Sequence, residues 1–564
     1  MAGQHPSSHA TIQDIKLDTF HVDDKQDDVK GEKTQPVLES AWAHTPPLTL
    51  ARLFWKAILI CAGILAGALF DGYAVTVPSS IAANKSFIAA FGTVVSKTGT
   101  KSLNAQYVSA WGGMSSGLQI FGMLTAGQTS DRFGRKLNLA FVCMFLSVAI
   151  VLELCAKNWI YFLMARGLAG WGTGMAKATL TCYVAEIAPS GLRGSILTMY
   201  SFMYALGQFS CAIALEIVQL KSLSWRNAFF AEIVFLALYV PVAIFAPESP
   251  WYYANKYDHD GAKRMLLKIN GNVPGYDAEH EYAVIAAEVE HNAALAAKSA
   301  AVSWSETFKG INGRRTWVSF LPLTTQQLVG SPFVFSYLSY FFSVAGVSNP
   351  FLPTVASNTI LLGGLVVAAF TVDKLGRRPL LLVSETINMV TILFMGMIGT
   401  FSKRNDGTLS STQSNAIVAL ACIWVAAYSM GPAPLGENGP LLTPRHQTHS
   451  STGYAYAAET STPVLRAKTT ALATAMCGAF ALAFTYCTPI MLSAQEANWG
   501  IEGVGYFYAC LAFIGLIGLY FTVPETRERS FAELDELFEA KVPARKFAST
   551  KTRFQSVEQG RSEV

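Results

Sequence analysis

The chain has 564 residues, of which 51% are hydrophobic and only 14% are charged. About a quarter of the residues of a soluble globular protein are charged, so this composition excludes an ordinary soluble enzyme and indicates a protein that crosses a membrane repeatedly. The net charge of +4 matters less than its distribution, because short loops rich in lysine and arginine stay on the cytoplasmic side.

Residues 1–52 are polar and lack the apolar core and cleavage site of a signal peptide, so they are predicted to form a disordered cytoplasmic tail. After this tail, runs of about 20 apolar residues, the length that crosses a bilayer, predict twelve helices in two groups of six. The first group, within 53–246, comprises 53–77, 107–129, 138–156, 159–184, 195–217 and 226–246. The second group, within 316–523, comprises 316–343, 353–372, 379–401, 415–436, 467–493 and 502–523.

The connecting segments complete the predicted topology. With the first tail inside, the basic loops also fall inside, so both termini are expected in the cytoplasm. The first outer loop contains Asn84-Lys-Ser86, an N-glycosylation sequon whose occupancy the sequence leaves open. Residues 247–315 are predicted to be a cytoplasmic linker of short helices, and 524–564 a cytoplasmic tail.

Three landmarks occur twice in the same order, which indicates an internal duplication of the kind found in secondary transporters. The first is Asp131-Arg-Phe-Gly-Arg-Lys136, repeated as Asp373-Lys-Leu-Gly-Arg-Arg378. The second is a glutamate seven residues before an arginine, at Glu186 and Arg193 and again at Glu459 and Arg466. The third closes each half, as Pro247-Glu-Ser249 and Pro524-Glu-Thr526.

These landmarks, with Arg166-Gly-Leu-Ala-Gly-Trp-Gly-Thr-Gly174 and Gln326-Gln327, make the chain resemble the sugar porter family of the major facilitator superfamily. Within it, Gln326-Gln-Leu-Val-Gly330 and Glu533-Leu-Asp-Glu-Leu-Phe538 look most like fungal α-glucoside and related sugar–proton symporters. The resemblance implies an all-α membrane fold of twelve transmembrane helices in two pseudo-symmetric six-helix bundles around a cavity that opens alternately to each side.

The duplicated turns resemble the cytoplasmic gates of this family, in which the aspartate meets arginines and the start of a helix from the other half. A helix start favours a carboxylate, and glycine permits the tight reversal between spans. Basic inner loops are also common without any gating role. The expected gating residues are Asp131, Arg132, Gly134, Arg135, Glu186, Arg193, Asp373, Gly376, Arg377, Glu459 and Arg466.

Charged residues inside spans are costly, so they are treated as functional. Asp71 and Arg166 share a depth, each roughly 9 to 10 Å from the outer end of its span at the helical rise. The family resemblance makes Asp71 the proton carrier and Arg166 the base that tunes it; the alternative is a static ion pair. Glu153 and Glu216 lie near outer ends, where they can reach water. Lys177 and Glu232 are deeper and remain unassigned.

Sugar binding calls for amides and aromatic faces near the bilayer midplane. The residues that match the family's sugar contacts, or line the same span, are Gln208, Gln326, Gln327, Tyr337 and Tyr340, although aromatic stripes on helices more often serve packing. Gly330-Ser331-Pro332 and Gly431-Pro-Ala-Pro-Leu435 replace an amide and a tryptophan of the hexose pattern. A disaccharide, a sugar derivative or a glycosylated metabolite therefore stays open as substrate.

Residues 437–453 interrupt the approach to Glu459 with a polar, proline-bearing stretch that cannot continue a membrane helix. This anomalous insertion is interpreted as an extra cytoplasmic loop or as a retained intron of the gene model.

The sequence as a whole predicts proton-coupled uptake of a sugar, possible substrates including an α-glucoside or another oligosaccharide, by a monomeric carrier in the plasma membrane. The alternatives are a facilitator or an exporter of a sugar-like or secondary metabolite, or a non-transporting nutrient sensor. The expected partners are the sugar, the proton and the lipid bilayer, with no nucleic acid. No enzyme activity, metal or cofactor is expected.

Overall fold

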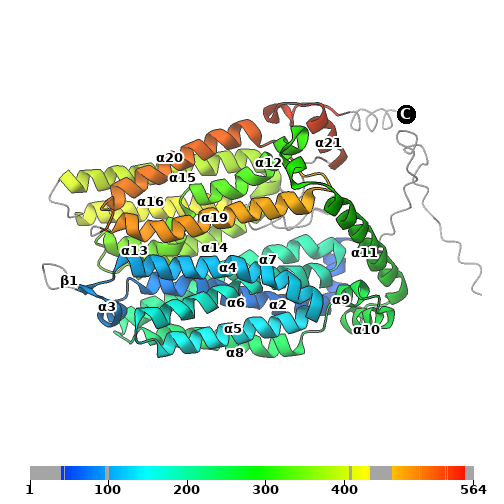
Figure 1. The fold of residues 1–564 in the computed structure, drawn as a ribbon, viewed down its shortest axis with the longest axis horizontal. Coiled ribbons are helices and arrows are strands. Elements are labelled where there is room, and N and C mark those ends of the chain that lie inside the picture. Colours follow the sequence, from blue (N-terminus) through cyan, green and yellow to red (C-terminus); the bar gives the residue numbers. More distant parts are fainter. Residues whose placement is uncertain are drawn as a thin grey trace, which may run out of the picture. The chain divides into compact units, whose positions relative to one another are not determined.

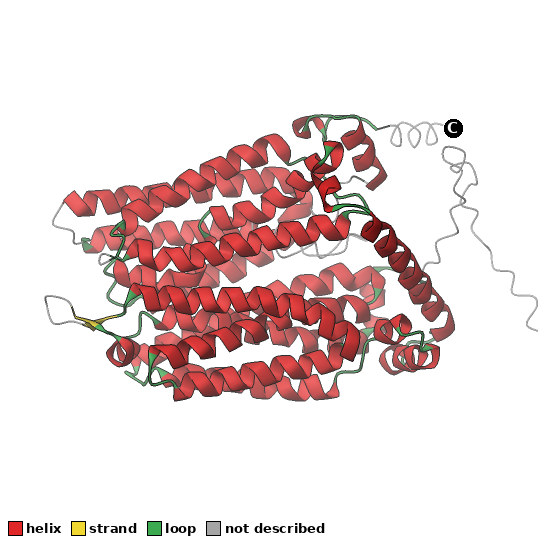
Figure 2. Cartoon of the chain, in the orientation of Figure 1, coloured by secondary structure: helices red, strands yellow, loops and turns green. Residues whose placement is uncertain are grey.

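The computed structural model describes residues 40–43, 45–95, 101–404, 409–431, 460–493, 496–527, 529 and 531–552. Nearly all of these residues are helical (Figures 1 and 2). One two-residue strand pair is present in the described part, with Val94 opposite Ser102 and Val95 opposite Lys101 in antiparallel register.

The first half begins with α1 (Pro47–Leu53) and ends with α8 (Arg226–Phe245). Between them lie α2 (Trp55–Ile81), α3 (Lys85–Phe91), β1 (Val94–Val95), β2 (Lys101–Ser102), α4 (Ala105–Phe133), α5 (Arg135–Cys155), α6 (Trp159–Ile187), η2 (Ser190–Leu192) and α7 (Arg193–Leu220). The segment that joins the halves contains α9 (Pro250–Asn255), α10 (His259–Asn270), α11 (Ala278–Ala301) and η3 (Trp304–Phe308).

The second half contains α12 (Gly310–Leu328), η4 (Pro332–Ser336), α13 (Tyr337–Val344), α14 (Phe351–Leu375), α15 (Arg377–Arg404), α16 (Ser411–Met430), α19 (Arg466–Leu492) and α20 (Gly500–Thr522). It is followed by α21 (Phe531–Glu539) and η5 (Ala544–Lys546). Eleven of the twelve predicted spans thus coincide each with one helix, and the seventh is divided among α12, η4 and α13. The predicted end of the tenth, 432–436, and the insertion 437–453 lie outside the described residues.

Within the described ranges, nine helices are long and apolar enough to cross a membrane: α2, α5, α7, α8, α14, α15, α16, α19 and α20. The predicted spans two and four, α4 and α6, fall short because they are rich in glycine, serine and threonine. These small residues let the two helices pack closely. A Cβ on Gly170 or Gly174 would lie 2.2 or 2.1 Å from a carbonyl oxygen of α4. The same polar, small-residue face holds Arg166.

The prediction of one continuous seventh span, 316–343, is wrong, because the chain turns out of α12 at Val329 and Gly330. Gly330 has a φ of +91°, a conformation that glycine adopts without steric cost. Pro332 then opens η4, a π-helical turn, before the helix resumes as α13. The break divides the helix directly after Gln326 and Gln327, the predicted sugar-binding pair.

The helices of each half pack into one bundle, and the two bundles meet chiefly along two helix pairs: α4 with α19, and α7 with α14. A smaller contact joins α2 to η4 and α13. Counted by span, the second span contacts the eleventh and the fifth contacts the eighth. The second and eighth spans hold equivalent positions in the two halves, as do the fifth and eleventh, so the internal symmetry relates the two contacts. Figure 1 shows α3 and β1 at one end of the helices, and α9 to α11 with α21 at the other. We call these the α3 end and the α11 end.

Candidate functional site

The turn between α4 and α5, at the α11 end, is held by a carboxylate from beyond the sixth span. Gly134 has a φ of +95° and a ψ of 164°, a combination that is almost restricted to glycine. Glu248 Oε1 accepts a hydrogen bond from the backbone N–H of Arg135 at 2.8 Å, and Glu248 Oε2 accepts one from the backbone N–H of Lys136 at 3.2 Å. The carboxylate therefore sits on the positive start of α5.

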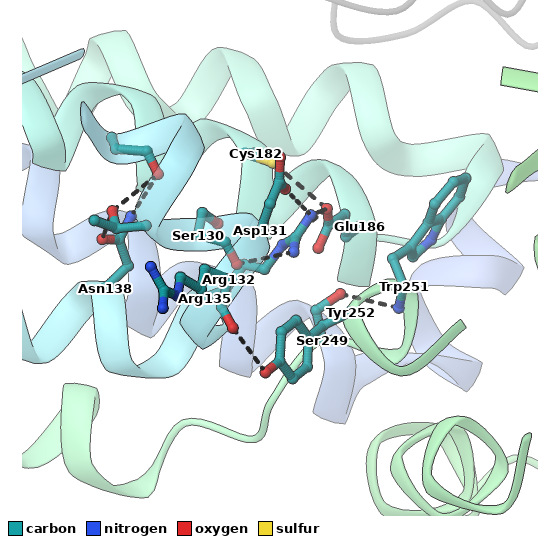
Figure 3. A network of polar contacts seen from close by, with 12 residues as sticks. Ser130, Asp131, Arg132, Arg135, Asn138, Cys182, Glu186, Ser249, Trp251 and Tyr252 are labelled. Carbon is teal, nitrogen blue, oxygen red and sulfur yellow. Dashed lines mark hydrogen bonds and ion pairs between the residues drawn. The ribbon is translucent and has the colours of Figure 1, made fainter. Parts of the chain in front are cut away.

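The side chain of Arg135 ties this turn to α6 (Figure 3). Its Nη2 and Nε lie 2.6 and 3.1 Å from Glu186 Oε1, and its Nη1 donates to the Ser130 carbonyl at 3.3 Å. Asp131 lies 3.7 Å from Arg135 Nη2, and its own side chain is 79% exposed. The carbonyl of Arg132 accepts from Tyr252 and Lys256 on the segment after α8.

Among the described residues, the expected contact of Asp131 with a helix start of the other half is not found. Asp131 pairs with Arg135, four residues later in the same half, and the helix start beside it is occupied by Glu248. The physical reason is the position of Asp131 relative to the start of α5. Asp131 is on the exposed last turn of α4, while the chain after Pro247 returns directly beneath α5.

The second half repeats this clamp with the equivalent residues. Gly376 has a φ of +86°, and the two oxygens of Glu525 accept from the backbone N–H groups of Arg377 and Arg378 at 3.2 and 3.1 Å. Glu248 and Glu525 are thus functional candidates that the sequence reasoning left out of its site, although the repeated Pro-Glu pair was the signal that could have found them.

The remaining gating residues are placed as follows. Arg193 begins α7, and the acidic charges that act on it are those of Glu288 and Glu186. Arg466 begins α19, where Asp535 of α21 is its acidic neighbour. The side chain of Asp373 and all of Glu459 lie outside the described residues.

Arg166 meets Glu153 and not Asp71, which corrects the predicted pairing. Arg166 Nη1 lies 2.7 Å from Glu153 Oε1, and the side chains are 3% and 0% exposed. Asp71 is fully buried in α2 and accepts a hydrogen bond from the Tyr200 hydroxyl at 2.9 Å. Glu153 does not reach water as expected, because α6 and α8 cover that face of α5.

Two further intramembrane charges adjoin these residues. Glu232 of α8 is buried, and it lies within the electrostatic reach of Glu153 and Arg166. Lys177 of α6 acts on Asp71 by its charge, and its ammonium lies 5.2 Å from the ring centre of Tyr204. Within its spans the first half therefore buries three acids, Asp71, Glu153 and Glu232, together with Arg166, while Lys177 is half-buried. In the second half, α15 buries Glu385, for which no sequence signal pointed to a partner.

The predicted sugar-binding residues are distributed around the break in the seventh span and along α7. Gln326 Nε2 donates to the Tyr428 hydroxyl of α16 at 2.7 Å. Gln327 reaches Cys477 of α19 at 3.5 Å and accepts from Ser331 at 3.3 Å. The two glutamines thus point to different helices, and the break places Ser331 beside one of them.

Gln208 lies on the part of α7 that packs tightly on α2. Its neighbour Gly207 has no room for a side chain, since a Cβ there would lie 2.0 Å from the Leu69 carbonyl oxygen. Tyr337 is buried and donates to the Thr485 carbonyl at 2.9 Å, and the ring of Tyr340 meets it edge-on. The hydroxyl of Tyr337 is therefore already engaged with α19.

The glycosylation prediction at Asn84 does not fit the structure. Asn84 is 2% exposed, and its Oδ1 caps α3 by accepting from the Ser86 and Phe87 backbone N–H groups at 2.9 and 3.3 Å. Its Nδ2, the atom that would carry a glycan, faces Gln219 at 3.5 Å. Glycans are carried on the protein surface, so a glycan on Asn84 would have to displace this helix cap.

Three comparisons relate the chain to known proteins. The model of a family described as "Sugar (and other) transporter" matches residues 59–437 and 446–538. The major facilitator-type transporter ecdD of Aspergillus rugulosus is 26% identical over 500 residues, which cover 86% of this chain and 87% of the relative. The hexose transporter HXT10 of Saccharomyces cerevisiae is 26% identical over 437 residues, or 75% and 74% of the two chains.

Among solved structures, the inward-open xylose transporter XylE from E. coli matches with a TM-score of 0.65 at 20% identity. The match covers 85% of this chain and 99% of XylE. Another XylE structure describes that protein as a proton:xylose symporter. The shared fold confirms the predicted membrane architecture of twelve helices in two six-helix bundles.

Proposed function

The chain belongs to the sugar transporter family of the major facilitator superfamily, and from this premise we propose that it takes up a sugar together with a proton by alternating access. The prediction that it is a membrane carrier and not an enzyme is confirmed by this membership. Three points belong to the proposal: proton coupling, the sugar class and the direction of transport.

The observation that carries proton coupling is Asp71. It is fully buried near the middle of α2, and its Oδ1 has no hydrogen-bond partner among the described residues. An acid in this setting is costly as a fixed charge, and it can gain and lose a proton as its surroundings rearrange. Burial disfavours its ionised form, while the charge of Lys177 on α6 and the Tyr200 hydroxyl on α7 favour it.

The sugar assignment is supported by Gln208, Gln326 and Gln327, which lie on α7 and on α12, directly before the break at Gly330. Amide side chains can both donate to and accept from sugar hydroxyls. The Tyr428 hydroxyl and Ser331 add polar groups to the same region. We infer that Gln326 exchanges its bond to Tyr428 for a bond to the sugar.

One alternative is favoured by a specific feature. Ser331 and Pro332 stand where the hexose pattern carries an amide, and the XylE-like fold also serves relatives that are not hexose carriers, such as the gluconate transporter ght3 of Schizosaccharomyces pombe. A sugar derivative, carried in either direction, is therefore the second candidate.

The test is uptake of labelled glucose, xylose, maltose and gluconate by a yeast strain without its own carriers, with and without an uncoupler. Proton-coupled uptake predicts accumulation above the external concentration, and its loss with the uncoupler. Asp71→Asn should abolish accumulation and leave downhill exchange of the same substrate. Accumulation that persists in Asp71→Asn would show that Asp71 is not the proton carrier.

We also propose that the α11 end faces the cytoplasm and the carrier resides in the plasma membrane, in accord with the charge rule. Cys155 ends α5 at the opposite end and is exposed. A membrane-impermeant maleimide added to intact cells should label the wild type and not Cys155→Ser. Labelling of Cys155 only after the cells are opened would reverse the orientation.

A further inference from the structure

A buried ion pair of the first half joins α5 to α6. Arg166 Nη1 lies 2.7 Å from Glu153 Oε1, and neither side chain has appreciable contact with solvent. Arg166 Nη2 also donates to the Ala74 carbonyl and to the Ser115 hydroxyl, both at 3.3 Å. The guanidinium thus has three partners from three helices, and Glu153 is the one acid among the described residues that forms an ion pair with it.

Asp71 stands one turn before Ala74 on α2, so Arg166 reaches the same helix without pairing with its acid. The Asp71 carboxyl is held by Tyr200 of α7 and by the charge of Lys177 on α6. The charges inside these spans therefore form two groups, Asp71 with the half-buried Lys177, and Glu153 with Arg166 and the nearby Glu232.

The other groups that face Glu153 come from α8 and α4. Glu232 of α8 is the acid whose charge acts together with that of Glu153. Tyr73 of α2 and Cys211 of α7 lie within the electrostatic reach of Glu232. Arg226 at the start of α8 donates to the Leu154 carbonyl, next in the chain to Glu153. From α4, the side chain that enters the group is the neutral Ser115.

We propose that Glu153 is a positioning residue for proton coupling: by neutralising Arg166 it keeps that charge from acting on Asp71. This inference rests on the proposed function. An uncompensated arginine near an aspartate favours the ionised aspartate, so a free Arg166 would make Asp71 release its proton at a lower pH. Glu153 acts through Arg166 and carries no transported proton itself.

The first experiment compares Glu153→Gln, Glu153→Asp and the exposed Glu290→Gln on α11 as matched control. Initial rates of labelled-sugar uptake are measured against external pH in the carrier-deficient yeast, normalised to the amount of carrier at the cell surface. Glu153→Gln should move the pH of half-maximal uptake down by about one unit, which equals a tenfold change in proton affinity. Its KM for sugar at the lowered optimum should stay within about twofold, and Glu153→Asp should keep the wild-type profile.

A profile of Glu153→Gln that overlays the wild type would overturn the inference and leave proton coupling intact. Loss of uptake at every pH, with normal surface expression, would also overturn it, since a positioning role predicts a shifted profile. Uptake by the wild type that ignores pH and uncoupler would instead refute the proposed function.

The pair itself is tested without transport, by charge exchange in the purified carrier. Glu153→Arg and Arg166→Glu each place two like charges in the bundle and should lower the midpoint of thermal unfolding. The double exchange restores an opposite-charge pair and should recover at least about half of the loss, because the two residues interact directly. If the decrease in the unfolding midpoint of the double variant equals the sum of the two single decreases, Glu153 and Arg166 do not interact in the folded carrier.

Discussion

At the scale of single residues, the carrier uses carboxylates as helix caps at both of its duplicated turns. Glu248 and Glu525 each accept from two successive backbone N–H groups, at the starts of α5 and α15. Bonds of this kind to a charged acceptor are stronger than neutral ones. The two glutamates therefore connect the end of each half to the duplicated turn of the same half, at Gly134 or Gly376.

Removal of either carboxylate should destabilise its half. Glu248→Ala and Glu525→Ala leave two N–H groups without their acceptor, and we expect each to lower the free energy of unfolding by about 1 to 3 kcal/mol. Thermal unfolding of the purified carrier in detergent measures the change. The exposed Glu290 of α11 provides the control, since Glu290→Ala should leave the midpoint unchanged. Equal midpoints for all three variants would remove the structural role assigned to the caps.

At the scale of elements, glycines decide where helices reverse and how closely they approach. Gly134 and Gly376 occupy equivalent positions with positive φ, and a Cβ on either would press on Glu248 or Glu525, at 2.4 and 2.8 Å. Gly127, by contrast, lies inside α4 with open space around it. Substitution of glycine by alanine should therefore destabilise the carrier at the two turns and stabilise it within α4.

Gly134→Ala and Gly376→Ala should each destabilise the carrier by about 1 to 3 kcal/mol, because alanine is strained at these backbone angles. Gly127→Ala should stabilise it by about 0.5 to 1 kcal/mol, since alanine favours the helix interior. The midpoints of thermal unfolding of the three variants, measured under the same conditions, test these expected changes in stability. A loss at Gly127 as large as that at Gly134 would contradict the backbone argument.

At the scale of the whole molecule, a contact between the halves is present at the α3 end. Asn349, in the segment between α13 and α14, donates from Nδ2 to both carboxylate oxygens of Glu216 on α7, at 2.9 and 3.1 Å. Because α7 and α14 belong to opposite halves, these bonds favour the state in which the α3 end is closed.

Asn349→Ala should shift the carrier toward states open at the α3 end by about tenfold, the equivalent of about 1.4 kcal/mol. Spin labels at the exposed positions Lys221 and Ser348 report the separation of the halves, and longer distances should gain population. Lys157→Ala, an exposed change at the same end, is the control. An unchanged distance distribution in Asn349→Ala would exclude this bond as a closing contact.

The insertion also belongs to this scale. The family match breaks between 437 and 446, inside the stretch 437–453 that the sequence marks as anomalous. We keep the two interpretations as proposals, an added loop or a retained intron. A peptide of the expressed carrier that contains His446 would establish the loop.

The sequence by itself determined the number and order of the membrane helices, because length and hydropathy act along the chain and need no partner. It also identified the duplicated turns, since Gly134 and Gly376 follow from local backbone requirements. Only the tertiary structure decided which charges meet. Asp71 and Arg166 share a depth, yet depth fixes position along a helix and not the direction in which a side chain points. Close packing of α2 on α7 turns Asp71 toward Tyr200, while the packing of α5 on α6 brings Glu153 to Arg166.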